Sequence, residues 1–149
     1  MTESTLKFNV GNNGTHPTKA YTQDAGFDLY AAEDAFIPHG ETRIISTDLS
    51  VSLQEGTFGL IAERSSMGAK GVSVGGGVID QGYTGELKVI LHNITSKSFV
   101  EPVLLTRGFK VKKGDKIAQL LVLPNMFAQA QNPNNSRGSG GFGSSDGQK

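Results

Sequence analysis

Residues 75–89 read Gly-Gly-Gly-Val-Ile-Asp-Gln-Gly-Tyr-Thr-Gly-Glu-Leu-Lys-Val, and no other part of the chain is as informative. Five glycines surround Asp80 and Tyr83, and the segment runs directly into a strand-like alternation. Glycine lets a backbone approach a ligand closely and adopt angles that other residues avoid. Backbone amides and carbonyls in such a loop can pair with a planar ligand such as a nucleobase. The pattern alone favours a simpler structure, a glycine-rich β-hairpin with an ordinary turn aspartate.

The pattern of apolar residues around this segment predicts a chain rich in β-strands. Residues 49–53 and 87–91 alternate between apolar and polar positions, which is typical of a strand with one buried face. Residues 57–62 are also predicted to form a strand. Residues 116–123 are almost continuously apolar and end at Pro124, which predicts a strand buried on both faces.

The arrangement of these segments predicts one all-β domain with a flexible tail. At 149 residues the chain has the length of a single domain, and only a short helical turn fits, at residues 65–70. Many short strands with glycine-rich turns are typical of a sandwich or jelly roll. Residues 1–130 are assigned to the β domain. Residues 131–149, rich in glycine, serine and asparagine, cannot bury enough apolar surface to be ordered alone.

Composition narrows the classes of function and location. The formal net charge is zero, so no overall field attracts the chain to nucleic acid or to a membrane, and neither is expected as a partner. The absence of cysteine excludes a disulfide framework and a thiol nucleophile. Residues 1–10 lack the apolar core of a signal peptide, and no apolar run approaches the roughly 18 residues of a membrane helix. The expected location is the cytoplasm, or the host cytoplasm if the protein is viral.

Five short motifs occur in order along the chain. They are Ala-Gly-Phe-Asp-Leu-Tyr-Ala-Ala at 25–32, Arg-Ser-Ser-Met-Gly at 64–68, Gly-Val-Ile-Asp-x-x-Tyr-x-Gly at 77–85, Gly-Asp-Lys-Ile-Ala-Gln-Leu at 114–120 and Arg-Gly-Ser-Gly-Gly-Phe-Gly-Ser at 137–144. Together they resemble the five motifs of the trimeric dUTP pyrophosphatases (dUTPases). The resemblance implies a distorted jelly-roll β-barrel that forms a homotrimer, with active sites between subunits.

The resemblance also implies an activity and its catalytic groups. The reaction would be hydrolysis of dUTP to dUMP and pyrophosphate, which keeps uracil out of DNA and supplies dUMP for thymidylate synthesis. Asp80 would be the base that activates the attacking water, with alignment of that water as its main contribution. Asp28 would contact the waters of Mg²⁺, an ion that keeps several waters and prefers phosphate oxygens. The alternative for Asp28 is a turn residue that caps backbone N–H groups.

Phosphate binding is assigned to polar residues of three motifs. They are Arg64, Ser65, Ser66, Gln119 and Arg137. Arginine suits phosphate because its planar fork donates two parallel hydrogen bonds, although a structural ion pair is an alternative role for Arg64. Gln119 lies within an apolar strand, where an unpaired amide is costly, so a specific partner is expected.

Discrimination between nucleotides is assigned to the third and fifth motifs. The implied substrate contacts there are Gly77, Val78, Ile79, Tyr83, Phe142, Gly143 and Ser144. The backbone from Gly77 to Asp80 would pair with uracil and leave no room for the methyl group of thymine. Tyr83 would lie beneath the deoxyribose, where a ribose 2′-hydroxyl clashes, and Phe142 would stack on the base.

Residues 98–109 depart from the family pattern by lengthening one connection. An extended hairpin is the favoured interpretation, and the apolar content of the segment also fits a protein-binding surface. One alternative function is therefore a dUTP-sensing regulatory trimer that binds a protein partner through these residues. A second alternative is a relative of the dCTP deaminases, but the position of Tyr83 and the motif at 137–144 favour the pyrophosphatase.

Overall fold

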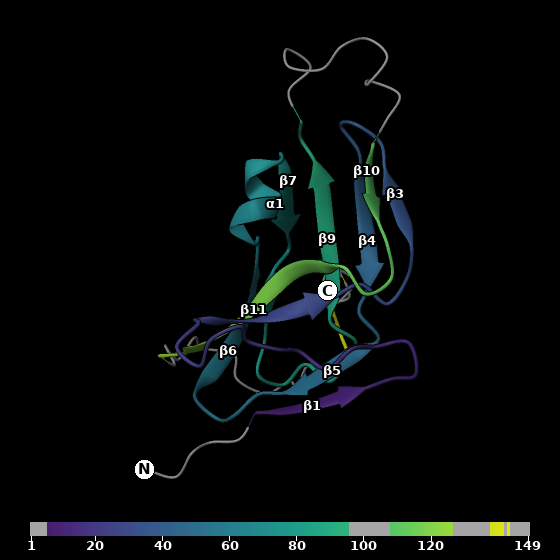
Figure 1. Ribbon diagram of the computed structural model, residues 1–149. Coiled ribbons are helices and arrows are strands. Elements are labelled where there is room, and N and C mark those ends of the chain that lie inside the picture. The colour runs from purple at the N-terminus through teal and green to yellow at the C-terminus, as the bar shows by residue number, and fades with distance from the viewer. Residues whose placement is uncertain (1–5, 96–107, 127–137, 142, 144–149) are drawn as a thin grey trace.

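The computed structural model describes residues 6–95, 108–126, 138–141 and 143, and in these ranges the fold is almost entirely β (Figure 1). Its strands are β1 (Lys7–Val10), β2 (Gly26–Tyr30), β3 (Ala35–Ile37), β4 (Thr42–Ser46), β5 (Leu49–Ser52), β6 (Thr57–Ala62), β7 (Val72–Gly75), β8 (Val78–Ile79), β9 (Lys88–Asn93), β10 (Phe109–Val111) and β11 (Lys116–Pro124). A short helix, α1 (Ser65–Ala69), lies between β6 and β7. The predicted all-β class and the short helical turn are confirmed. In the ranges described, no helix is long and apolar enough to cross a membrane.

The sheets bring together strands that are distant in sequence. One sheet has the order β2-β11-β6-β8, and a second has the order β4-β9-β7. Two further antiparallel pairs, β1 with β5 and β3 with β10, complete the described strands. Figure 1 shows α1 beside β7 at one edge of the second sheet, with the β3–β10 pair beyond β4. The first sheet therefore places the first, second and fourth motifs next to one another.

The strands predicted from alternation are confirmed, and they form the core. β5, β6 and β9 correspond to residues 49–53, 57–62 and 87–91. Leu87, Val89 and Leu91 are completely buried, and they pack in one apolar cluster with residues of the other sheet. Full burial of such a side chain contributes about 1.5–3 kcal/mol, so this face of β9 is a large source of stability.

β11 differs in part from its prediction. Ile117, Ala118 and Leu120 are buried as expected, but residues 121–123 are only half-buried, so burial on both faces is wrong for this end of the strand. The pairing with β2 ends where Leu121 meets Gly26, whereas the pairing with β6 continues to Pro124. Within the described ranges, the last residues of β11 therefore pair with a strand on one side only.

The glycine-rich segment connects β7 to β9, which pair as an antiparallel hairpin. The predicted hairpin is confirmed, but its connection is wide, because β8 leaves the hairpin and pairs with β6 of the other sheet. A Cβ atom on residue 77 would lie 2.1 Å from the carbonyl oxygen of Ile61, so only glycine allows this crossing. Ile61 donates its N–H to the Gly77 carbonyl at 2.7 Å. Gly77 is thus required for a close contact between two segments of the protein's own backbone.

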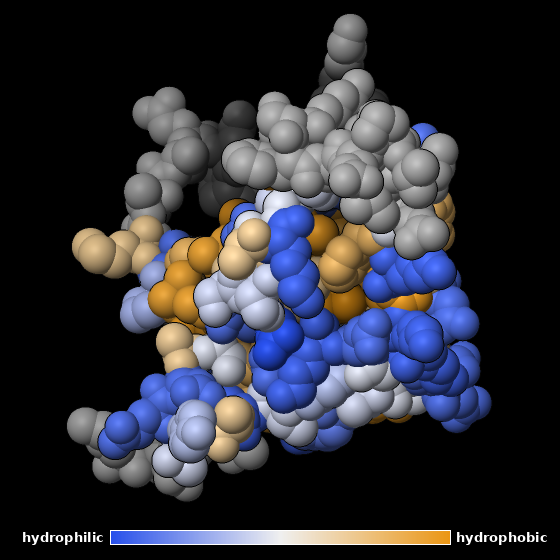
Figure 2. Space-filling view, turned by 45° about the horizontal axis from the view of Figure 1, so that its top comes forward, coloured by the Kyte–Doolittle hydropathy of each residue, from blue (hydrophilic) through white to orange (hydrophobic). Residues whose placement is uncertain are grey.

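Several apolar side chains lie on the surface of this fold. Ile44 on β4 is 53% exposed and Val78 on β8 is 62% exposed. Figure 2 shows one face of the molecule, where apolar surface is visible in a hollow beside a strongly hydrophilic region. Apolar surface of this kind is commonly covered by a ligand or by another chain.

Candidate active site

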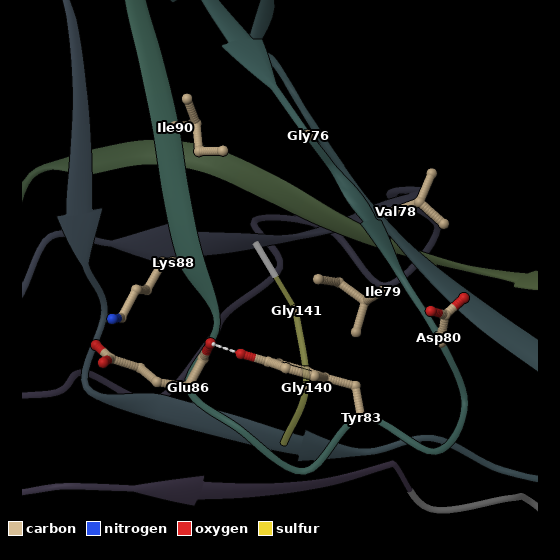
Figure 3. Close-up of a pocket in the computed structure, with 10 residues that line it drawn as sticks. All are labelled: Gly76, Val78, Ile79, Asp80, Tyr83, Glu86, Lys88, Ile90, Gly140 and Gly141. Carbon is tan, nitrogen blue, oxygen red and sulfur yellow. Dashed lines mark hydrogen bonds between the residues drawn. The ribbon is translucent and has the colours of Figure 1, made fainter. Parts of the chain in front are cut away.

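A cavity of about 270 Å³ opens over the connection between β7 and β9 (Figure 3). We call it the loop pocket. Its lining residues are Gly76, Val78, Ile79, Asp80, Tyr83, Glu86, Lys88, Ile90, Gly140 and Gly141. Ile79 projects into it in Figure 3, Asp80 lies on one side, and Glu86 and Lys88 lie on the other. The pocket therefore joins an apolar floor to charged groups at its rim.

Tyr83 is held in one orientation within the loop pocket. Its hydroxyl donates a hydrogen bond to the Glu86 backbone carbonyl at 2.8 Å, and its N–H donates to the Asp80 carbonyl at 3.0 Å. Partial burial, and secondly the negative charge of Glu86, raise the pKa of the Tyr83 hydroxyl above its ordinary value. Because the phenol stays protonated at neutral pH, it acts as a donor to Glu86, and its ring has a fixed place.

The backbone of the third motif is only partly available to a ligand. Val78 and Ile79 pair with β6, and the Gly77 carbonyl accepts the N–H of Ile61. Gly77 itself does not line the loop pocket, whereas Val78, Ile79 and Asp80 do. Asp80 is exposed at the end of β8, so its side chain can be reached from solvent.

The part of the tail that the structure describes packs against the same loop. Gly138 forms a parallel bridge with Tyr83, and its carbonyl accepts the Thr84 N–H at 2.8 Å. Gly140 and Gly141 line the loop pocket. Gly143 is exposed and has a positive φ of 90°. The predicted contacts Arg137, Phe142 and Ser144 lie outside the described residues.

Residues of the first, second and fourth motifs form a separate group at the centre of the first sheet. Asp28 forms two ion pairs: its Oδ1 lies 3.1 Å from Arg64 Nε, and its Oδ2 lies 3.0 Å from Lys116 Nζ. Gln119 lies opposite Asp28 in the register of β11 with β2. We call Asp28, Arg64, Lys116 and Gln119 the ion-pair cluster. The structural ion pair weighed as an alternative for Arg64 is thus present, and Asp28 lies in a strand, not in a turn.

Gln119 finds the partner that its position in an apolar strand requires. Its Nε2 donates to the Glu63 carbonyl at 2.8 Å, which ties β11 to the end of β6. A Cβ on Gly26 would lie 2.6 Å from Gln119 Oε1, so the glycine leaves room for the amide. Gln119 therefore fixes the backbone just before Arg64. Ser65 and Ser66 follow at the exposed start of α1.

The loop pocket and the ion-pair cluster are distinct within one chain. No cluster residue lines the pocket. Ile79 pairs with Gly59 in the antiparallel register of β8 with β6, so Asp80 lies one position beyond Gly59 toward the start of β6. Arg64 lies five residues from Gly59 in the other direction. Asp80 and Arg64 are therefore about six residues apart along β6, which corresponds to roughly 20 Å at the rise of a strand. One chain does not bring Asp80 and Arg64 into contact.

The charged groups define what kind of metal the site could accept. Among the described residues no three His, Cys, Asp or Glu side chains lie together in a metal-binding group. Both oxygens of Asp28 already face cations. Such a donor set fits Mg²⁺ only if the ion takes most of its ligands from phosphate oxygens and water, as Mg²⁺ commonly does.

Three residues of the site were missed from sequence. Glu86 and Lys88 line the loop pocket, and Lys116 is the second cation on Asp28. Lys88 lies on the exposed face of β9, and the alternation of apolar and polar residues does predict this position. The contact between Lys116 and Asp28 depends on the pairing of β11 with β2, which no local pattern reveals.

The fold and this site define an all-β protein with a cavity beside a glycine-rich loop, and comparison with known proteins specifies it further. The family model for dUTPase matches residues 12–146. The deoxyuridine 5′-triphosphate nucleotidohydrolase of Saccharomyces cerevisiae is 40% identical over 139 residues, covering 89% of this chain and 87% of the yeast protein. The chain therefore belongs to the dUTPase family, as its motifs predicted, and its enzyme class is dUTP diphosphatase.

Solved structures agree with this assignment. The dUTPase of Staphylococcus bacteriophage 80alpha, a mutant with dUpNHpp, aligns with a TM-score of 0.74 and 25% identity, covering 88% of this chain and 97% of the phage chain. A mutant dUTPase from phage phi11 of S. aureus, described as coordinating a structural Mg(II) ion, aligns with a TM-score of 0.74 and 26% identity. It covers 89% of this chain and 98% of the phage chain.

The segment 98–109 is described only at its end. Phe109 begins β10 and pairs with Ile37 of β3. The remaining residues up to 107 lie outside the described ranges. An extended hairpin there, and a protein partner bound through it, stay predictions.

Proposed function

We propose that the protein hydrolyses dUTP to dUMP and pyrophosphate, thereby limiting uracil in DNA and supplying dUMP for thymidylate synthesis. The observation that carries the proposal is the loop pocket, where Asp80, Tyr83 and both residues of β8 line one cavity. Family membership favours this reaction over deamination of dCTP. The pocket offers an apolar floor for a base and a carboxylate at its rim for an attacking water.

The proposed chemistry divides among named groups. Asp80 accepts a proton from the water that attacks the α-phosphorus, in line with the departing pyrophosphate. Arg64, with Ser65, Ser66 and Gln119, holds the phosphates, and a triphosphate would compete with Asp28 for the Arg64 guanidinium. Mg²⁺, when bound, would neutralise charge on the phosphate oxygens. Asp28 would hold waters of that ion while it also orients Arg64.

Specificity follows from the shape of the loop. The backbone of Val78 and Ile79 would pair with uracil, and Tyr83 would lie beneath the sugar, where its fixed ring leaves no space for a 2′-hydroxyl. Pyrophosphate release from dUTP, dTTP, dCTP and UTP tests the proposal. Turnover of dUTP alone is expected. Comparable turnover of dTTP or UTP, or no turnover of dUTP, would contradict it.

A homotrimer of distorted jelly rolls is proposed as the working form. The separation of roughly 20 Å between Asp80 and Arg64 in one chain supports a site that is completed by a second copy. The exposure of Val78 beside the pocket supports the same arrangement, because assembly or substrate would cover it. Light scattering on a sizing column should give the mass of three chains.

The tail is proposed to be a lid separate from the β domain, with the boundary near residue 130. Arg137 would contact phosphate and Phe142 would stack on uracil, with Gly143 and Ser144 beside them. The described contact between Gly138 and Thr84 supports a lid that closes near the loop pocket. Truncation after Asn135 should leave the fold and its thermal stability intact while strongly lowering kcat/KM. Full activity of the truncated protein would show that the segment is not a lid.

A further inference from the structure

Glu86 connects the loop pocket to a turn in another part of the fold. Its side-chain Oε1 accepts the Asp48 N–H at 2.9 Å and also accepts the Ser46 hydroxyl. Its backbone carbonyl accepts the Tyr83 hydroxyl at 2.8 Å. A single residue therefore links the turn between β4 and β5 to the aromatic ring that lines the pocket.

The β4–β5 turn is a firm anchor for this link. Asp48 has a φ of 49°, a conformation that residues other than glycine seldom adopt, and its carboxylate accepts the Asn13 N–H at 2.8 Å. The neighbouring residue Leu87 donates its N–H to the Leu49 carbonyl at 2.7 Å and accepts the Thr47 hydroxyl through its own carbonyl. The peptide that receives the Tyr83 hydroxyl is thus held to the turn by both residues 86 and 87.

We propose that Glu86 is a positioning residue for Tyr83 and, through it, determines discrimination between deoxyribose and ribose triphosphates. This inference rests on the proposed function, in which Tyr83 lies beneath the sugar. Hydrogen bonds to an ionised carboxylate are stronger than neutral ones, so the two donors at the turn hold Glu86 tightly. The Tyr83 hydroxyl lies over Gly85, where a Cβ atom would come within 2.6 Å of it. The ring therefore rests against backbone on that side.

Two effects of Glu86 can be separated by substitution. As an acceptor, its Oε1 fixes geometry, and the amide oxygen of a Gln would preserve this role. As a charge, it acts on the Tyr83 hydroxyl, whose pKa is raised first by burial and secondly by this charge. Lys88 points toward Glu86 in Figure 3, while Asp80 lies across the pocket. The charges of Lys88 and Asp80 are the same in all the variants proposed below, so differences between these variants do not arise from them.

The first measurement is the ratio of kcat/KM for dUTP to that for UTP. We expect Glu86→Ala to lower this ratio about tenfold, because it removes two hydrogen bonds to a charged group. Glu86→Gln should retain most of the ratio. Glu33→Ala is the matched control, since Glu33 Oε1 accepts the Ser46 N–H at 2.8 Å at the same turn but does not line the pocket. It should leave the ratio unchanged.

A double-mutant cycle shows whether Glu86 acts through the tyrosine. In a Tyr83→Phe background the hydroxyl is absent, so Glu86→Ala should change the ratio no further. An equal fall with and without the hydroxyl would overturn the proposal, as would a Glu86→Ala variant with the discrimination of the control. If Glu86→Ala does not fold, Ser46→Ala removes one of the same hydrogen bonds and should lower the ratio in the same direction. An unchanged ratio in Ser46→Ala would then count against the proposal.

The second measurement needs no nucleotide and so distinguishes failure of this inference from failure of the proposed function. The chain has three tyrosines. With Tyr21→Phe and Tyr30→Phe, alkaline absorbance titration reports on Tyr83 alone. Glu86→Ala removes both the anchor at the turn and the charge, so it should lower the midpoint, because the ring is then less firmly buried and has no negative charge beside it. Glu33→Ala should leave the midpoint unchanged. A midpoint that Glu86→Ala leaves unchanged would overturn the positioning role of Glu86, whatever the activity assays give.

Discussion

The loop pocket and the ion-pair cluster are built by different physical means. The pocket depends on backbone geometry, with a glycine crossing at residue 77, a two-residue strand and one aromatic ring held by a carbonyl. The cluster depends on charged side chains that three adjacent strands and the start of α1 bring together. Backbone geometry suits recognition of a base and sugar by shape, whereas convergent cations suit phosphate. In the function proposed above, one small fold would therefore place substrate specificity and phosphate binding in two separate regions.

The two regions also differ in how they relate to stability. Asp28 is 17% exposed and faces two cations, so loss of one partner leaves a half-buried charge without full compensation. The loop residues Val78 and Asp80 are exposed, and changes there cost little in folding. Substitutions of these two exposed residues should therefore act on catalysis and little on stability, and those in the cluster should act on both catalysis and stability.

Asp80→Asn should have the largest effect on catalysis. Asparagine has nearly the same shape but cannot accept the proton, so kcat should fall about 10²- to 10⁴-fold while dUTP still binds. Pyrophosphate release gives kcat, and calorimetry with a non-hydrolysable dUTP analogue gives binding. Asp24→Asn removes the same charge from another turn and should keep full activity. Near wild-type turnover by Asp80→Asn would falsify the assignment of the base.

Arg64→Met should be next in size and should affect the cluster's function. Loss of a charge-assisted contact to phosphate should lower kcat/KM about 10- to 100-fold. Arg43→Met is the control, because Arg43 pairs with Glu41 at the surface, with side chains 43% and 49% exposed. Steady-state kinetics on both variants separates a phosphate role from a general loss of charge. Equal kinetics in the two variants would assign Arg64 a structural role only.

Asp28→Asn should reveal the double role of the cluster. We expect a loss of stability of about 1 kcal/mol, larger than that of Glu41→Gln, because Asp28 is more buried and faces two cations. Its activity should fall less than that of Asp80→Asn and should recover partly at high Mg²⁺. Chemical denaturation and a Mg²⁺ titration of turnover measure the two effects. If the activity lost in Asp28→Asn does not depend on the Mg²⁺ concentration, Asp28 has no role in binding the metal.

The smallest effect concerns Tyr83 and alkaline pH. Its pKa is raised in the folded protein, so the folded state holds the proton more tightly than the unfolded state. Stability should therefore be constant below pH 10 with respect to this group and should fall as pH rises through the folded pKa. Tyr83→Phe should remove that part of the fall in thermal melts recorded across this range. Identical dependence of thermal stability on alkaline pH in the wild type and in Tyr83→Phe would show that folding does not raise the pKa of Tyr83.

Sequence predicted these two regions unequally. The strands at residues 57–62 and 116–123 are predicted from local patterns of apolar residues. Because no longer stretch shows a helical period, the sequence leaves room only for a short helical turn. The pairing of β8 with β6 could not be predicted, because it depends on a glycine at residue 77 meeting a carbonyl 16 positions earlier in the chain. The double ion pair of Asp28 likewise depends on the register of three strands.

The most direct test of this division is complementation between two variants that are each impaired in one of the two regions. Asp80→Asn keeps an intact ion-pair cluster, and Arg64→Met keeps an intact loop pocket. If each site takes its loop from one subunit and its cluster from another, trimers refolded from an equal mixture will contain both intact parts in about a quarter of their sites. Pyrophosphate release from dUTP should then rise well above that of either variant alone. A mixture no more active than its components would show that both regions act within a single chain, contrary to their separation in this structure.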